Sequence, residues 1–120
     1  MPERPSPPDD IAPEEFFTRW LPGAVAADAD RRARLGGADH VLLFELEGEG
    51  GGLFHLRVRE GAVEGYPGAP VRADLRVRLD VATWRELNRG ALSAPEAFLR
   101  RRVRLEGNLA LALKLHFIIG

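Results

Sequence analysis

The sequence predicts an α+β fold in two layers, in which helices pack on one face of a largely antiparallel sheet of about five strands. Three observations lead to this expectation. Several segments between residues 40 and 106 alternate apolar and polar residues, which is the period of a half-buried strand. Strands with one polar face accept helices on the other face only, which excludes a doubly wound sheet. Capped apolar segments before and after these strands predict the helices.

The first helix is expected to begin at Pro13, because Glu14 and Glu15 behind it suit a helix N-terminus. Large apolar side chains then share one helix face: Phe16, Phe17, Trp20 and Leu21. Pro22 is expected to stop this helix, because proline lacks an amide hydrogen. A second helix is expected over residues 23–34, closed by two glycines.

Alternation of apolar and polar residues predicts five strands. They are residues 40–47, 53–59, 62–66, 72–80 and 102–106. Residues 48–52 are rich in glycine, but no helix follows them whose N-terminus would donate to a phosphate. We therefore interpret this segment as a hairpin loop.

Three more helices are expected around the last strand. Asp80 and Ser93 are good N-caps for the first two, of which the first covers residues 81–89. Asn108 precedes the third, and residues 109–115 are apolar on nearly every side. A helix of this kind must be buried all round or line an apolar space.

Composition and charge limit the classes of function. The 120 residues fit one domain, which we place at residues 12–120 after a disordered, proline-rich tail at residues 1–11. The net charge of −1 draws the chain to neither nucleic acid nor an anionic membrane, so we expect at most transient membrane contact. The absence of cysteine excludes disulfides and thiol chemistry and fits a cytoplasmic location. Lys114 is the only lysine, which we interpret as the composition of a GC-rich, bacterial genome.

No segment carries the residues that enzymatic chemistry needs, so we expect no catalytic residue, no cofactor and no metal. None of the histidines, His40, His55 and His116, has a carboxylate placed by the sequence to orient it. Ser6 lies in the tail and Ser93 is an N-cap, so neither is a candidate nucleophile. Arginines gather on the polar sheet face, but acidic residues lie among them and no aromatic residues are interleaved. Nucleic acid is therefore not expected as a partner.

Four short segments follow one another in the last third of the chain: Gly90-x-Leu92, Glu96-Ala97-Phe98, the strand Val103-Arg104-Leu105 and the segment Gly107–Leu115. They resemble the sterol-carrier-protein-2-like lipid-transfer family. Residues 73–77, leading into Trp84, are similar too, so the resemblance covers about residues 12–120. Arg101 departs from the pattern, because the family tends to carry glycine before this strand.

The resemblance implies a non-enzymatic carrier that holds a fatty acyl, isoprenoid or sterol-like lipid in an apolar tunnel between helices and sheet. The residues expected to form its wall are Phe16, Phe17, Trp20, Trp84, Phe98, Leu109, Leu113 and Phe117. On the pattern alone a solid core is the simpler interpretation of these residues. The surplus of apolar residues in the last helix and the resemblance together favour the tunnel.

An alternative function, from a different class, uses the same apolar helical face to bind a protein. The chain would then be an accessory module that pairs with a second copy of itself or with a partner enzyme. In that case Phe16, Phe17 and Trp20 are expected to be exposed in the monomer and buried in the dimer.

Overall fold

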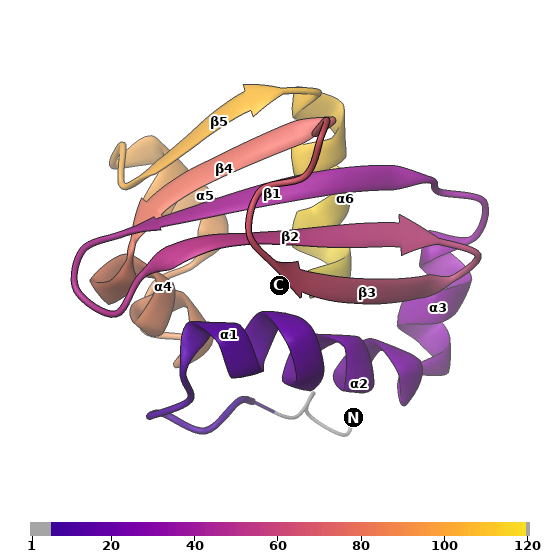
Figure 1. The fold of residues 1–120 in the computed structure, drawn as a ribbon, viewed down its shortest axis with the longest axis horizontal. Coiled ribbons are helices and arrows are strands. Elements are labelled where there is room, and N and C mark those ends of the chain that lie inside the picture. The colour runs from indigo at the N-terminus through magenta and orange to yellow at the C-terminus, as the bar shows by residue number, and fades with distance from the viewer. Residues whose placement is uncertain (1–5, 120) are drawn as a thin grey trace.

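The computed structural model describes residues 6–119, and the side chains of residues 6–114. Five strands form one mixed sheet in the order β3-β2-β1-β4-β5 (Figure 1). They are β1 His40–Glu47, β2 Gly52–Arg59, β3 Ala62–Pro67, β4 Leu75–Asp80 and β5 Val103–Gly107. Only the central β1–β4 pair is parallel, and the other three neighbouring pairs are antiparallel. The predicted α+β class with a largely antiparallel sheet is confirmed.

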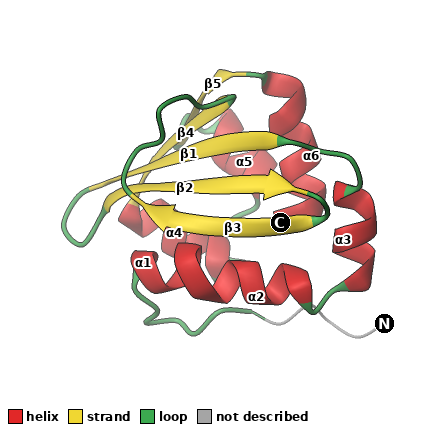
Figure 2. Ribbon diagram, turned by 45° about the vertical axis from the view of Figure 1, so that its right-hand side comes forward, coloured by secondary structure: helices red, strands yellow, loops and turns green. Residues whose placement is uncertain are grey.

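The helices lie on one side of this sheet (Figure 2). They are α1 Pro13–Glu15, η1 Phe16–Trp20, α2 Leu21–Ala26, α3 Ala29–Leu35, α4 Val81–Asn88, α5 Ala94–Leu99 and α6 Leu109–Ile119. On the opposite face, the connection from β3 to β4 crosses over β2 and β1 (Figure 1). We call the helix-covered side of the sheet the inner face and the other side the outer face.

The first helical stretch is longer than the sequence predicts. The three segments α1, η1 and α2 follow one another without a break, and Pro22 lies inside this stretch. The middle segment is a π-helix, in which the N–H of Leu21 donates to the carbonyl of Phe16, five residues earlier. Pro22 then occupies the first turn of α2, where a missing amide hydrogen is tolerated. The prediction that Pro22 stops the helix is therefore wrong.

The single helix predicted over residues 23–34 is also wrong, because the chain breaks before α3. The Asp28 carboxylate accepts hydrogen bonds from the backbone N–H groups of Asp30 and Arg31, both at 3.1 Å. Asp28 is thus an N-cap that starts a new helix at Ala29. The glycine end is confirmed, since Gly36 follows α3 with a φ of 42°.

The predicted caps of the later helices are confirmed by hydrogen bonds at each N-terminus. The side chains of Asp80, Ser93 and Asn108 accept from backbone N–H groups three residues further on, at 2.7 to 3.2 Å. Strand β4 begins at Leu75, three residues later than predicted. Asp74 precedes it and exchanges two hydrogen bonds of 2.8 Å with the backbone of Val41, which fixes β4 beside β1.

The first helical stretch contacts the sheet backbone to backbone at strand β3. A Cβ atom at Gly65 would lie 1.7 Å from the carbonyl oxygen of Phe17, so only glycine fits at this position. The contact holds η1 against the sheet and leaves the Phe17 side chain only 1% exposed. The hydrophobic core therefore lies between the inner face and the helices, and η1 forms one of its walls.

Candidate ligand-binding cavity

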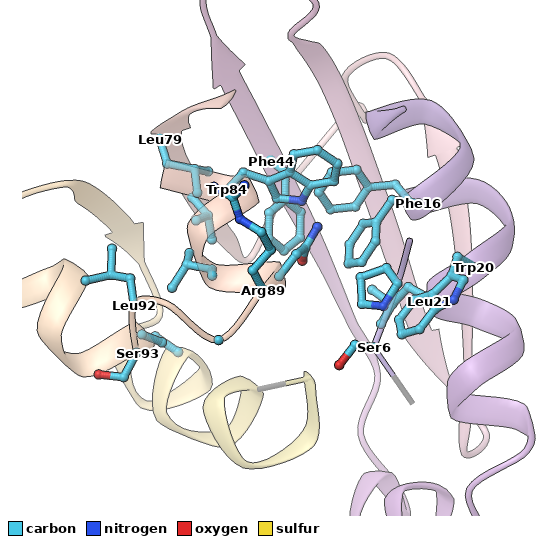
Figure 3. A pocket seen from close by; sticks show the side chains of 18 of the residues that line it. Ser6, Phe16, Trp20, Leu21, Phe44, Leu79, Trp84, Arg89, Leu92 and Ser93 are labelled. Atoms are coloured by element: carbon cyan, nitrogen blue, oxygen red, sulfur yellow. The ribbon is translucent and has the colours of Figure 1, made fainter. Parts of the chain in front are cut away.

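A cavity of about 530 Å³, open to solvent on one side, lies between the helices and the inner face (Figure 3). Its floor consists of inner-face residues of three strands: Phe44, Leu75, Val77, Leu79 and Leu105. Its helical walls include Phe16, Phe17, Trp20, Leu21, Trp84, Leu87 and Ala112. Phe16 and Trp20 lie across it from Leu92 and Ser93 (Figure 3). Mostly apolar side chains thus line a space that opens to solvent.

Six aromatic rings meet at one end of the cavity, and we call them the aromatic cluster: Phe16, Phe17, Trp20, Phe44, Phe54 and Trp84. Phe16 stands edge-on to Trp84 with centroids 5.3 Å apart, and it stacks on Trp20 at 5.6 Å. Phe17 stacks on Phe54 at 5.2 Å. These spacings are typical of attractive aromatic pairs, so the cluster is a packed and rigid part of the wall.

Trp84 brings a polar atom into this apolar wall. Its side chain is only 4% exposed, and its Nε1 atom makes no hydrogen bond to any residue that the structure describes. A buried N–H group without a partner costs free energy, because it has lost its water. The cavity wall thus contains a donor that a ligand oxygen would satisfy.

Arg31 is the charged residue of the buried wall. It is 4% exposed, and its Nε atom lies 3.3 Å from Oδ2 of Asp28. Since Asp28 also caps α3, the same carboxylate holds the helix start and the guanidinium. A buried charge is tolerated when it is paired in this way.

The mouth of the cavity is marked by its exposed lining residues. Ser6 belongs to the N-terminal segment, and Arg89, Gly90 and Ser93 belong to the connection between α4 and α5. The N-terminal segment is held down by Arg85, whose Nη1 atom donates to the backbone oxygens of residues 9 and 11 at 2.9 and 3.1 Å. Ser6 and Pro7 of the expected tail therefore line the cavity, whereas Ile11 packs in the core.

Of the eight predicted wall residues, four line the cavity: Phe16, Phe17, Trp20 and Trp84. Phe98, Leu109 and Leu113 do not line it, and they are 50%, 57% and 69% exposed. The side chain of Phe117 lies outside the described residues. The structure thus brings together the residues predicted on the first helix and on α4, but not those on α5 and α6.

The floor residues lie on strands, whereas all the predicted wall residues lie on helices. Leu75, Val77 and Leu79 alternate with charged residues along β4, and Phe44 lies on the apolar face of β1. The same alternation that predicts these strands therefore also marks the floor of the cavity. No sequence signal indicates that Arg31 belongs to the wall.

Among the side chains that the structure describes, no histidine or acidic residue lines the cavity. Among the described residues, no three histidine or acidic side chains lie close enough to hold a metal ion. His40 lies 3.9 Å from the carboxylate of Asp74, a neighbour that the sequence does not predict, but neither residue lines the cavity. In the part of the chain that the structure describes, no helix is long and apolar enough to cross a membrane.

The chain also matches a known protein family. A sequence profile described as the SCP-2 sterol transfer family matches residues 17–120. The chain belongs to this family. The predicted resemblance is thereby confirmed, and with it a lipid-binding or lipid-transfer type of domain.

Three individual proteins illustrate the range of relatives. Hydroxysteroid dehydrogenase-like protein 2 of Pongo abelii is 31% identical over 98% of this chain, which spans only 28% of that relative's length. Palmitated SCP2L2 of Aedes aegypti has a TM-score of 0.68 at 18% identity, over 88% of this chain and 92% of its own. The sec-alkylsulfatase Pisa1 of Pseudomonas sp. has a TM-score of 0.71 at 22% identity, over 90% of this chain and 16% of its own.

Proposed function

We propose that the chain is a non-enzymatic carrier that holds one fatty acyl, isoprenoid or sterol-like lipid in the apolar tunnel formed by this cavity. The observation that carries the proposal is a cavity of about 530 Å³ with aromatic and aliphatic walls. Ligand sites in proteins commonly have volumes of about 300–1,000 Å³ and apolar walls with a few polar groups. The cavity therefore fits a ligand with an extended apolar part.

Burial of the apolar chain supplies enough free energy for binding without any catalytic group. Each methylene buried contributes about 0.8 kcal/mol, so ten contribute about 8 kcal/mol before the costs of ordering. That gross value corresponds to a dissociation constant near micromolar. Since apolar walls distinguish poorly between chains of similar width, we expect broad selectivity.

The unpaired Nε1 of Trp84 favours a lipid with a hydrogen-bond acceptor over a plain hydrocarbon. A carboxylate, hydroxyl or keto oxygen at this point would satisfy the buried N–H group. The palmitated state of the Aedes aegypti neighbour supports a fatty acid as one such ligand. We propose fatty acids as the first ligands to test.

The distribution of polar groups supports a carrier rather than an enzyme. The two serines of the chain lie at the cavity mouth, and the oxygen of Ser93 is occupied as the cap of α5. Within the described residues, neither serine forms a hydrogen bond with a histidine. A cytoplasmic location and a bacterial source remain part of the proposal and rest on the amino-acid composition.

The decisive experiment compares two phenylalanine substitutions on opposite faces of β4. Val77→Phe fills the cavity floor, so we expect affinity for a fluorescent fatty acid to fall about tenfold or more. Arg76→Phe adds the same ring on the outer face and is expected to leave affinity within about twofold. Circular dichroism checks that both variants fold.

Lipid mass spectrometry of the denatured wild-type protein completes the test. We expect an extract that contains a lipid, and uptake of fluorescent fatty acid by the delipidated protein. An empty extract with no uptake, or equal affinities of the two phenylalanine variants, contradicts the carrier function.

A second candidate function is association with another protein, and we propose it for a different surface from the predicted one. Phe16 and Phe17 are buried in the monomer, which removes them as an interface. Four apolar side chains of α5 and α6 are exposed instead: Phe98, Leu99, Leu109 and Leu113. Light scattering distinguishes the two candidates, since a strict monomer that contains lipid supports the carrier and a lipid-free dimer supports association.

A further inference from the structure

A second cleft, of about 230 Å³, opens where β4 leads into α4 and β5 begins. We call it the arginine cleft, and its lining residues are Glu47, Arg78, Leu79, Asp80, Thr83, Arg101, Arg102 and Arg104. Four arginines thus face two carboxylates. The volume is several times the roughly 30 Å³ that one water molecule occupies in the liquid, so a small polyatomic anion fits.

Arg101 occupies a backbone conformation that disfavours any side chain. Its φ is 59°, in the left-handed region, and Glu60 is the other non-glycine residue with a positive φ in the described part of the chain. Glycine adopts this conformation without the clash between Cβ and the backbone. Strain of this kind is common at binding sites, and here it places a guanidinium at the cleft.

A second unfavourable arrangement lies in the same cleft. Arg78 of β4 and Arg104 of β5 are directly opposite each other in the antiparallel pairing. Like charges at opposed positions repel each other and weaken the pairing of the two strands. An anion held between the two guanidinium groups would turn this repulsion into attraction.

The carboxylates near the arginine cleft pair with only some of its arginines. Arg78 donates to Glu45 at 2.6 Å, and Arg102 contacts Glu86 and donates to Oγ1 of Thr83 at 3.1 Å. Arg101 and Arg104 form no ion pair with any residue that the structure describes. Two guanidinium groups therefore remain available to a bound anion.

Asp80, the remaining acid of the cleft, is engaged at the start of α4. Its carboxylate accepts a hydrogen bond of 2.7 Å from the backbone N–H of Thr83. Hydrogen bonding to the side chain of Thr83, together with this backbone bond and to a smaller extent Arg102, lowers the pKa of Asp80, so its negative charge persists at neutral pH. The four arginines of the cleft still outnumber its two carboxylates.

We propose that the arginine cleft binds a phosphate group, with Arg101 and Arg104 as its principal ligands. Planar guanidinium groups bind phosphate oxygens in pairs, which suits a site built from several arginines. Leu79 lines both the arginine cleft and the apolar cavity, so the two spaces are adjacent. The phosphate therefore comes either from a free anion or from the headgroup of a lipid whose chain lies in the cavity.

The first experiment uses inorganic pyrophosphate and does not depend on the proposed function. Titration calorimetry of the wild-type protein at about 0.15 M ionic strength is expected to show saturable binding. Arg101→Gly is expected to weaken this binding about tenfold and to leave the unfolding temperature equal or higher, because glycine relieves the strained backbone. Arg72→Ala, an exposed arginine outside both spaces, is the matched control and should change nothing.

The second experiment identifies the source of the phosphate by comparing dodecyl phosphate with dodecanoic acid. If the phosphate is a lipid headgroup, Arg101→Gly lowers the affinity for dodecyl phosphate about tenfold and leaves the affinity for dodecanoic acid unchanged. If it is a free anion, only pyrophosphate binding depends on Arg101.

Three results would overturn the proposal: no saturable binding of either phosphate compound, unchanged phosphate affinity in Arg101→Gly, or an equal loss in Arg72→Ala. Failure of the proposed carrier function appears separately, as absent binding of dodecanoic acid.

Discussion

The side chains on the two faces of strand β4 differ in how closely they pack with their neighbours. On the inner face Leu75, Val77 and Leu79 border a cavity, whereas on the outer face Arg76 and Arg78 form ion pairs with carboxylates of the neighbouring strands. Alternation along one strand thus produces an unfilled apolar space and a connected charged surface. A cavity forfeits packing contacts, so the inner face gains less from packing than a filled core would.

Removal of an aromatic side chain that packs against the inner face should have the largest effect. Phe17 is 1% exposed and contacts four other rings of the aromatic cluster, so Phe17→Ala is expected to lower the free energy of unfolding by about 3–5 kcal/mol. Urea denaturation measures this loss. Leu99→Ala, at a side chain that is 79% exposed, is the control and should cost under about 0.5 kcal/mol. Similar losses in both variants would mean that η1 does not pack as described.

The corresponding change on the outer face should have a smaller effect. Glu45 lies between Arg76 and Arg78, at 3.6 and 2.6 Å, and its side chain is 20% exposed. Glu45→Gln leaves these arginines without their shared carboxylate, so we expect the unfolding temperature to fall by about 5 °C at low salt. The loss should shrink in 1 M salt because repulsion is screened. Glu49→Gln, in the exposed hairpin loop, serves as the control, and an effect independent of salt would contradict the electrostatic explanation.

Asp80 ends β4 and is the N-cap of α4, and its replacement should change the free energy of unfolding in a way that depends on pH. Because its pKa is lowered in the folded state, its contribution to stability is present above the pKa of the unfolded chain and is lost as pH falls through the folded value. We expect Asp80→Ala to cost about 1 kcal/mol at pH 7 and clearly less at pH 3. Urea denaturation at the two pH values tests this. A cost that stays constant with pH would show that the charge of Asp80 does not contribute.

The smallest expected effect concerns the polarity of the cavity itself. Trp84→Phe keeps a ring in the wall but removes the buried Nε1 donor, so the affinity for dodecanoic acid should fall about two- to fivefold. Binding of dodecane, which has no acceptor, should not fall. Competition with a fluorescent fatty acid measures both affinities, and an equal loss for both ligands would assign the effect to ring size alone.

Much of the fold follows from local patterns, because the strands and the helix caps are set by neighbours in sequence. Alternation predicts all five strands, and Asp80 and Ser93 predict the starts of two helices. The prediction at Pro22 fails because a π-helical turn precedes it and places the proline at a tolerated position. This turn contacts β3 at Gly65. That contact joins residues far apart in the chain and leaves no local signal.

The cavity was predictable in kind but only partly in its residues. A helical pattern shows that Phe98 and Leu113 are apolar, but the rotation of each helix about its axis depends on packing against the sheet. An arginine is usually exposed, and the sequence does not show that Asp28 is an N-cap. The burial of Arg31 beside this carboxylate is therefore not predicted. The opposition of Arg78 and Arg104 depends on strand register, which single strands do not reveal.

The close contact of the first helical stretch with Gly65 also protects one border of the sheet. One border of the sheet, β3, lies alongside η1 and α2, which obstructs pairing with a foreign strand. The other border, β5, is only five residues long and presents Arg104 and Glu106. Short, charged or covered borders are the usual protection against amyloid-like stacking. Both borders of the sheet are thereby protected against pairing with a second chain, whether or not the cavity is filled.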